Sequence, residues 1–296
     1  CGPALGMAAY PTENMTMSAP APMIELTHVR RTFGQTVAVE DLSLAIPPGE
    51  IFAFLGPNGA GKTTTIKMLV GLLQPSQGSL RVAGWDVVKH PQQAAQQIGY
   101  VPDEPFLYDK LTGREFLEFI AQVRGMDPQQ AQDCIAYQAE LFQLHGFLDQ
   151  LTDTYSHGMK QRVVFASVLL HDPPLLVADE PMVGLDPKSV RLVKDLMRAR
   201  AAQGKTVFIS THTLALAEEI ADRIGILHRG RLLFVGSLAQ MRQQGLMQDK
   251  SLEEFFLELT DGQDHAQPPH APVEDIPLAA GEGASIWGLP SASSVP

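Results

Sequence analysis

The sequence is poor in cysteine and in long apolar runs. Cys1 and Cys134 are the only cysteines in 296 residues. Two cysteines without a Cys-x-x-Cys spacing exclude a cysteine zinc site and a disulfide framework, which fits a reducing compartment. The longest candidate apolar run, residues 163–170, is far shorter than the roughly 18 residues that a membrane span needs. We therefore expect a cytoplasmic chain that does not itself cross the membrane.

Basic residues are scarce as well. The chain has 22 Lys and Arg against 33 Asp and Glu, a net charge of −11. Nucleic-acid binding shows as clustered Lys and Arg on one face, so the charge balance argues against a nucleic-acid partner. Residues 1–22 have neither a basic leader nor an unbroken apolar segment and are expected to form a flexible arm. Residues 261–296 are acidic, contain no Lys or Arg, and are rich in Pro, Gly and Ser, which predicts a disordered tail.

A glycine-rich segment follows the apolar run at 51–55 and precedes residues with helical spacing. It has the pattern G-x-x-x-x-G-K-[ST], in which backbone N–H groups wrap phosphates, the lysine reaches the terminal phosphates and the hydroxyl binds Mg²⁺. A plain glycine-rich turn is the alternative, and the flanking strand and helix favour the phosphate loop. The expected nucleotide-binding residues are Gly56, Pro57, Asn58, Gly59, Ala60, Gly61, Lys62, Thr63 and Thr64, with Thr63 also a metal ligand.

Two adjacent carboxylates end a second apolar run, at 175–178. In a phosphate site Asp179 is expected to hold Mg²⁺, and Glu180 to polarise the water that attacks the γ-phosphate. The alternative is a pair of ordinary surface acids at the end of a strand. Another apolar run lies at 207–210, and a helix-like segment, 189–202, separates the two runs. This alternation predicts a parallel sheet whose strands end at the active site.

The other periodic segments outline the remaining architecture. Residues 24–29, 39–46 and 79–83 are expected to be strands, and helical spacing runs from 114 to 170. We predict an α/β domain over 23–260, with a helical subdomain at about 98–170 and a C-terminal helical extension at about 237–260.

The polar turn at 155–162, taken with these motifs, resembles the signature of the ATP-binding subunits of ABC transporters, Leu-Ser-Gly-Gly-Gln. Ser156 and Gly158 match it, whereas Tyr155, His157 and Met159 depart from it in a way similar to exporter-type members. The resemblance covers about residues 23–260. It implies a RecA-like P-loop NTPase core with an antiparallel β lobe and an inserted helical subdomain.

The resemblance also implies roles for single residues. Phe33 is similar to the aromatic that stacks on adenine, with simple core packing as the alternative. Asp103 occupies the position of a glutamine that contacts Mg²⁺ and senses the permease, so a shorter, charged ligand stands there. Asp186 belongs to a loop similar to the dimer-contact loop, and His212 is similar to the switch histidine near the γ-phosphate.

The function that the resemblance implies is ATP binding and hydrolysis in an exporter. The subunit would form a homodimer around two ATP molecules, Ser156 and Gly158 contacting the ATP held by the other protomer. It would lie on the inner face of the cell membrane, bound to a separate multi-span permease, and would have no cargo site of its own. The alternative is a soluble ABC ATPase of DNA repair or translation, against which speak the single cassette, the absence of heptads and the lack of zinc cysteines. A kinase or GTPase that shares only the phosphate loop lacks support, since no Asn-Lys-x-Asp motif occurs.

Three large apolar residues, Phe106, Leu107 and Tyr108, stand in a loop between the core and the helical lobe. They either pack under the helical lobe or stay exposed as a contact patch. We favour a patch that receives a short cytoplasmic helix of the permease, because the resemblance places that contact at this junction.

Overall fold

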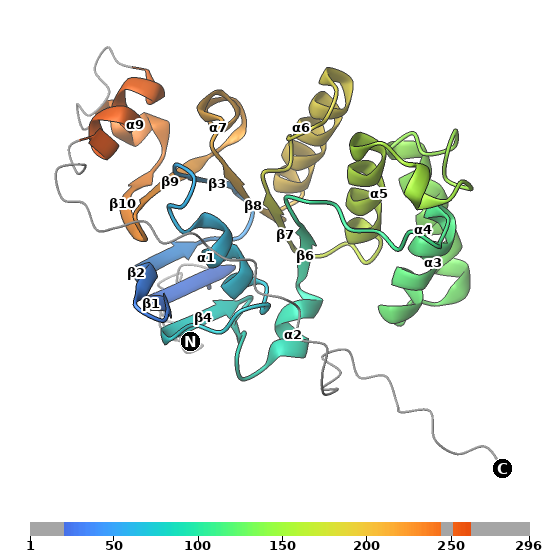
Figure 1. The fold of residues 1–296 in the computed structure, drawn as a ribbon, viewed down its shortest axis with the longest axis horizontal. Helices are drawn as coiled ribbons and strands as arrows, with labels where there is room; N and C mark the ends of the chain where they lie inside the picture. Colours follow the sequence, from blue (N-terminus) through green and yellow to red (C-terminus); the bar gives the residue numbers. More distant parts are fainter. Residues whose placement is uncertain (1–20, 244–250, 262–296) are drawn as a thin grey trace, which may run out of the picture.

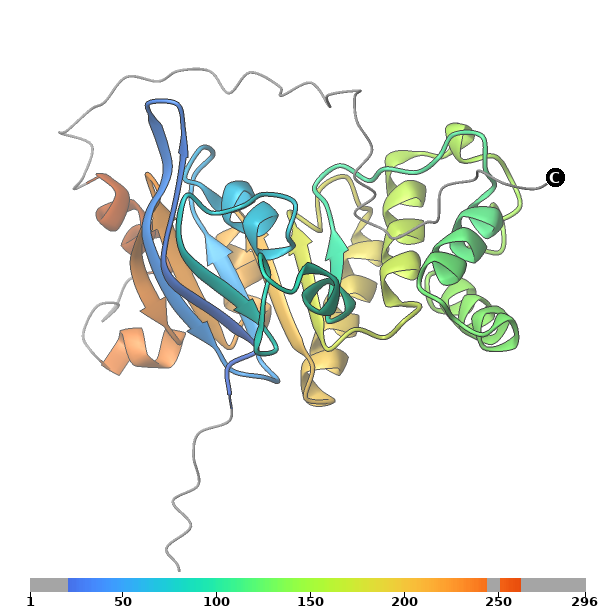
Figure 2. The same ribbon diagram turned by 90° about the horizontal axis from the view of Figure 1, so that it is seen from below.

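The computed structural model describes residues 21–243 and 251–261. The predictions for the N-terminal arm and the acidic tail therefore lie almost wholly outside the described residues. The chain forms two sheets, and Figures 1 and 2 show helices around them and a helical cluster at one end of the molecule.

A six-stranded sheet forms the centre, in the order β10-β9-β3-β8-β7-β6. Strands β9, β3, β8, β7 and β6 are parallel, and β10 is antiparallel to β9. The parallel arrangement predicted from the apolar runs is thus confirmed. The sequence pattern does not predict β9 and β10 at the edge of the sheet. The strands are β3 (Ile51–Leu55), β6 (Ile98–Val101), β7 (Leu175–Asp179), β8 (Thr206–Thr211), β9 (Arg223–His228) and β10 (Arg231–Gly236).

A second, antiparallel sheet has the order β2-β1-β4-β5. Its strands β1 and β2 run to the hairpin turn and are longer than the alternation predicts. The register of this pair shifts three times between Leu26 and Thr32, which breaks the period of two in β1 although the backbone pairing continues. The strands are β1 (Ile24–Phe33), β2 (Thr36–Ile46), β4 (Gln77–Val82) and β5 (Trp85–Asp86).

The helical subdomain begins later than predicted. Residues 98–101 form β6 and pair in parallel with β7, so they belong to the sheet and not to the helical part. Gly99 permits this, because a Cβ there would overlap Val168 of α5 and Pro173. The strand has four residues, too few to show a period. The first helix of the subdomain, α3, starts at Gly113.

The described helices surround the sheets, and none of them is long and apolar enough to cross a membrane. Helices α3 to α5 form the end cluster in Figure 1, and α8 and α9 lie within the predicted C-terminal extension. The helices are α1 (Lys62–Leu69), α2 (Pro91–Gln96), α3 (Gly113–Val123), α4 (Pro128–Leu141), α5 (His157–Leu169), α6 (Pro187–Ala202), α7 (Leu214–Ile220), α8 (Leu238–Gln243) and α9 (Leu252–Asp261), with a 3₁₀ turn, η1 (Thr152–Thr154).

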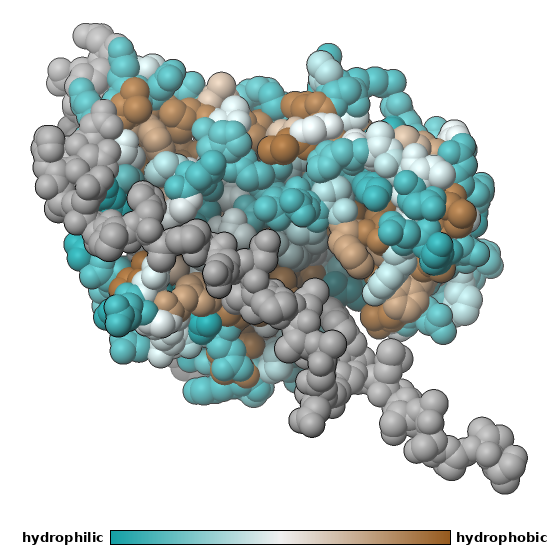
Figure 3. All heavy atoms as spheres, viewed as in Figure 1, coloured by the Kyte–Doolittle hydropathy of each residue, from teal (hydrophilic) through white to brown (hydrophobic). Residues whose placement is uncertain are grey.

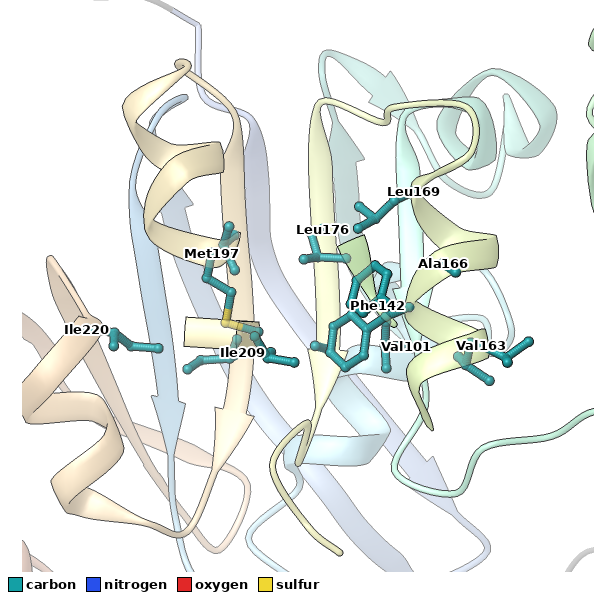
Figure 4. Packing of buried hydrophobic residues seen from close by; sticks show 14 of the residues in the cluster. Val101, Phe142, Val163, Ala166, Leu169, Leu176, Met197, Ile209 and Ile220 are labelled. Atoms are coloured by element: carbon teal, nitrogen blue, oxygen red, sulfur yellow. The ribbon is translucent and has the colours of Figure 1, made fainter. Parts of the chain in front are cut away.

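Each face of the central sheet is covered by its own apolar core. On one face, Phe142 packs toward β7 and α5, with Leu176 and Ala166 beside it in Figure 4. On the other, Phe52 stacks on Phe208, their ring centroids 5.7 Å apart, beneath the antiparallel sheet. Burial of one such side chain contributes about 1.5–3 kcal/mol. The strands that lead to the functional loops are therefore held firmly on both sides. The outer surface drawn in Figure 3 is mostly hydrophilic, with separate hydrophobic patches.

Candidate functional site

Three neighbouring strands of the central sheet, β3, β8 and β7, end at the same edge. The glycine-rich loop follows β3, Asp179 ends β7 with Glu180 directly after it, and His212 follows β8. In open parallel sheets this edge is where ligands bind. The fold thus brings together motifs that are more than a hundred residues apart in the chain.

The glycine-rich loop can hold its shape only with glycine at its two ends. Gly61 has φ of 106° and directly precedes α1, and a Cβ on it would lie 2.5 Å from the carbonyl oxygen of Ala38. A Cβ on Gly56 would overlap the carbonyl oxygen of Leu227. The loop is therefore confined between β2 and β9. Within it Asn58 and Gly59 are exposed, Ala60 is buried, and Pro57, Thr63 and Thr64 are half-buried.

Lys62 folds back over the loop. Its Nζ donates to the carbonyl oxygens of Gly56 at 2.6 Å and Pro57 at 3.2 Å. Burial lowers the pKa of the lysine, and the charges of Glu180 and Asp179 act in the opposite sense. A buried ammonium beside a glycine-rich loop at a helix N-terminus is a favourable partner for a phosphate group.

Asp179 lies fully buried at the end of β7. Its Oδ1 accepts a hydrogen bond from the Ser210 hydroxyl, and no residue among those described makes a hydrogen bond of normal geometry to Oδ2. Burial raises the pKa of Asp179, as do the charges of Asp103 and Glu180, while the hydroxyls of Ser210 and Thr63 lower it. A buried carboxylate oxygen without a partner is costly unless a cation or donor reaches it.

Glu180 has an unusual backbone conformation for a residue with a side chain. Its φ is 45°, and its N–H donates to the Ser210 carbonyl at 3.1 Å. Such positive φ values in non-glycine residues are uncommon and concentrate at functional sites. Its Oε1 lies 2.9 Å from Nδ1 of His212, so the two predicted catalytic residues form a pair.

Asp103 faces the same site from the loop after β6. Its charge adds to the effect of burial in raising the pKa of Asp179 and that of Tyr100. The Oδ1 of Asp103 accepts a hydrogen bond from the Glu104 N–H at 3.0 Å. Within the described ranges no three His, Cys, Asp or Glu side chains converge as a metal site. The chain therefore offers single carboxylates at this place, and not an all-protein cage.

The first turn of α5 presents the predicted signature residues. Ser156 caps the helix, its hydroxyl accepting from the Met159 N–H at 3.3 Å, and Gly158 is the second helical residue. Tyr155 has a role that sequence reasoning missed. Its hydroxyl donates to the Phe147 carbonyl at 2.7 Å and accepts from the Gly113 N–H at 3.2 Å, so it anchors the turn inside the helical subdomain.

Asp186 and Phe33 occupy different surroundings. Asp186 caps α6, accepting from the N–H groups of Lys188 and Ser189 at 2.9 and 3.1 Å, and hydrogen bonds from Ser189 lower its pKa.

Phe33 stands at the turn of the β1–β2 hairpin with 37% of its surface exposed, so it is not part of either core. The guanidinium of Arg31 lies 4.6 Å from its ring centroid. An exposed ring supported in this way can stack on a flat ligand.

A pocket of about 600 Å³ opens between the Asp103 loop, the start of α5 and Glu180. It is lined both by side chains of the helical subdomain and by Glu180. The phosphate loop does not line it, so it is adjacent to the phosphate site and separate from it. Its lining residues are Asp103, Glu104, Pro105, Tyr155, His157, Lys160, Glu180 and Val183.

Comparisons with known proteins identify the family of the chain. Residues 39–183 match the family model described as ABC transporter. An uncharacterized ABC transporter ATP-binding protein of Bacillus subtilis is 39% identical over 71% of this chain and 68% of its own length. The Nod factor export ATP-binding protein I of Burkholderia orbicola is 37% identical over 72% and 70%.

Solved structures give the same result. An ATP binding subunit of an ABC transporter matches with a TM-score of 0.76 and 33% identity, over 80% of this chain and 99% of that one. A dimeric ATP-binding cassette in a post-hydrolysis state with ADP and Pi matches with a TM-score of 0.67 and 25% identity, over 73% and 99%. The predicted RecA-like fold is confirmed. The chain belongs to the ABC transporter family, as one of its ATP-binding, ATP-hydrolysing subunits.

Proposed function

We propose that this subunit drives an exporter by closing as a homodimer around ATP and transmitting the movement to a separate multi-span permease on the inner face of the cell membrane. The observation that carries the proposal is the Glu180 and His212 pair, set beside Lys62 and Asp179 at one sheet edge. The Burkholderia relative is named for export, which supports that direction of transport. No relative described above supports the alternative of a DNA-repair or translation ATPase.

Mg²⁺ fits the residues at the end of β7. The buried Oδ2 of Asp179 has no hydrogen-bond partner among the described side chains. The Thr63 hydroxyl is near enough to lower the pKa of the same carboxyl group. Mg²⁺ is usually held by one or two protein ligands together with phosphates and water. Asp179 and Thr63 would hold the ion, with Asp103 facing it. When bound, it would neutralise charge on the terminal phosphates.

The remaining predicted residues support a composite site. Phe33 would stack on adenine, and Ser156, Gly158 and the loop before Asp186 would meet the nucleotide and the phosphate loop of the partner protomer. The dimeric form of the related cassette structure supports this arrangement. The Ser156 hydroxyl is used as a helix cap. The N–H groups at the N-terminus of α5 are therefore the groups that would bind an anion here.

Ser156→Arg is expected to abolish ATP-dependent dimerisation while each monomer still binds ATP. A cation at the start of α5 opposes the positive end of the helix dipole and fills the space meant for the partner's γ-phosphate. Size-exclusion chromatography with ATP, in a Glu180→Gln background that slows hydrolysis, measures the dimer. Gln129→Arg places the same cation on exposed surface at the start of α4 and is the control. An equal amount of dimer with and without Ser156→Arg would refute the composite site.

The loop between β6 and α3 divides its apolar residues between core and surface. Phe106 is 71% exposed and Tyr108 46% exposed, whereas Leu107 is buried. The Tyr108 ring meets Phe106 and Phe119 edge to face, with centroids 5.6 and 5.7 Å apart. We propose that these exposed rings receive a short helix of the permease, and that Leu107 anchors the loop beneath them.

Phe106→Ser is expected to uncouple the subunit from its permease without loss of fold. The ring is mostly exposed, so its removal should change the melting temperature by no more than about 2 °C, in line with surface substitutions of ±0.5 kcal/mol. Co-purification with the co-expressed permease should be lost. Tyr137→Ser removes a ring that is 65% exposed on α4 of the same subdomain and serves as the matched control. Undiminished co-purification of the Phe106→Ser variant would exclude the contact.

A further inference from the structure

We infer that His157 is a positioning residue: it holds the turn that carries Glu180 against the start of α5 in the same subunit. His157 is one of the three residues that depart from the family signature, and it stands where the signature has its first glycine. Its Nε2 lies 3.2 Å from the carbonyl oxygen of Val183. With the proton on Nε2, the ring donates a hydrogen bond from the helical subdomain to the loop that follows β7.

The bond continues through the backbone to the catalytic glutamate. The N–H of Val183 donates to the carbonyl oxygen of Glu180 at 3.2 Å, which closes a tight turn over residues 180–183. The Glu180 carboxylate meets His212 at 2.9 Å. Two hydrogen bonds, linked through the main chain of Val183, thus join the His157 ring to the Glu180 main chain, whose φ of 45° needs support from its surroundings.

The backbone next to Val183 is shaped to receive the ring. Gly184 has φ of +72°, and a Cβ on it would overlap the Cδ2 and Nε2 atoms of His157. A Cβ on Gly158 would lie 3.6 Å from the carbonyl oxygen of Gly184, an ordinary contact distance. The first turn of α5 and the loop at 183–184 therefore pack directly on each other. A glycine at position 157 would make neither the bond nor the ring contact.

A second hydrogen bond joins the same two parts of the molecule. The Nζ of Lys188, in the first turn of α6, donates to Oε1 of Gln143 in the helical subdomain at 2.9 Å. Two contacts tie the segment after β7 to the subdomain that carries the signature residues. A rotation of the helical subdomain would thus be passed to the turn that positions Glu180. This step rests on the proposed role of Glu180 in hydrolysis.

The test compares three variants of the full chain in steady-state ATP hydrolysis and equilibrium ATP binding. His157→Ala is expected to lower kcat about 3- to 10-fold, the effect of losing one neutral hydrogen bond, with the Kd for ATP and the melting temperature unchanged. His157→Gln, whose amide can donate to the same carbonyl, should restore kcat to within about twofold of the parent. His145→Ala removes an exposed histidine paired with Glu140 in the same subdomain and should change nothing.

Three results would overturn the inference. An unchanged kcat in His157→Ala shows that the contact does not position Glu180. A raised Kd for ATP assigns His157 to nucleotide binding, and a lowered melting temperature assigns it to folding. A glutamine variant as slow as the alanine variant excludes the hydrogen bond. Failure of the proposed function is seen separately, because it would appear as undiminished hydrolysis in Glu180→Gln with His157 intact.

Discussion

Glu180→Gln is expected to reduce the kcat of ATP hydrolysis about 10²–10⁴-fold and to leave ATP affinity unchanged. The change removes the proposed general base and retains the size of the side chain, one oxygen that can meet His212 and a non-glycine residue at φ of 45°. Asp179, which lies fully buried next to it, is untouched. Phosphate release with saturating ATP measures kcat, and titration with a fluorescent ATP analogue measures affinity.

Glu118→Gln provides the charge-matched control for this measurement. Glu118 is exposed on α3, so its neutralisation changes the net charge by the same amount without touching the site. Turnover of Glu180→Gln within a few-fold of the parent would show that another group activates the water. A large loss of ATP affinity would instead assign Glu180 to binding.

Lys62→Ala is expected to weaken ATP binding about 10²-fold, since charge-assisted hydrogen bonds contribute about 1.5–3 kcal/mol each. Lys62 donates hydrogen bonds to the carbonyl oxygens of Gly56 and Pro57, and burial lowers its pKa. A lysine whose pKa is lower in the folded than in the unfolded protein makes folding less favourable near neutral pH, where the lysine is charged. A bound phosphate would reverse that effect by stabilising the charged form. The substitution should therefore cost far more affinity than stability.

Equilibrium titration with the fluorescent ATP analogue and thermal unfolding of the free subunit separate these two effects. Lys67→Ala, which removes an exposed lysine from the last turn of α1, is the control and should bind ATP as the parent does. Unchanged affinity in Lys62→Ala would contradict the assignment of the phosphate loop. A melting temperature that falls steeply would show that the lysine mainly holds the loop together.

The sequence predicts those features that depend on local chemistry. The strand, glycine-rich loop and helix at 51–69 form because each piece favours its own conformation, and the turn tolerates only glycine where Gly56 and Gly61 approach Leu227 and Ala38. The Asp179 and Glu180 pair is predictable because buried strands rarely end in two carboxylates. The carboxyl ends of parallel strands meet at one edge, so the sequence also predicts that these motifs converge, as the strand order confirms.

Tertiary structure alone decides the features that depend on packing between distant segments. Residues 98–101 form a strand because β7 supplies hydrogen-bond partners, and β9 and β10 pair at the sheet edge without a clear period of their own. Leu107 is buried between two exposed rings, which no local pattern indicates. The contact of His157 with Val183 joins residues 26 positions apart. It exists only because α5 and the loop after β7 pack together, and so its effect on Glu180 is a property of the fold and not of the signature motif.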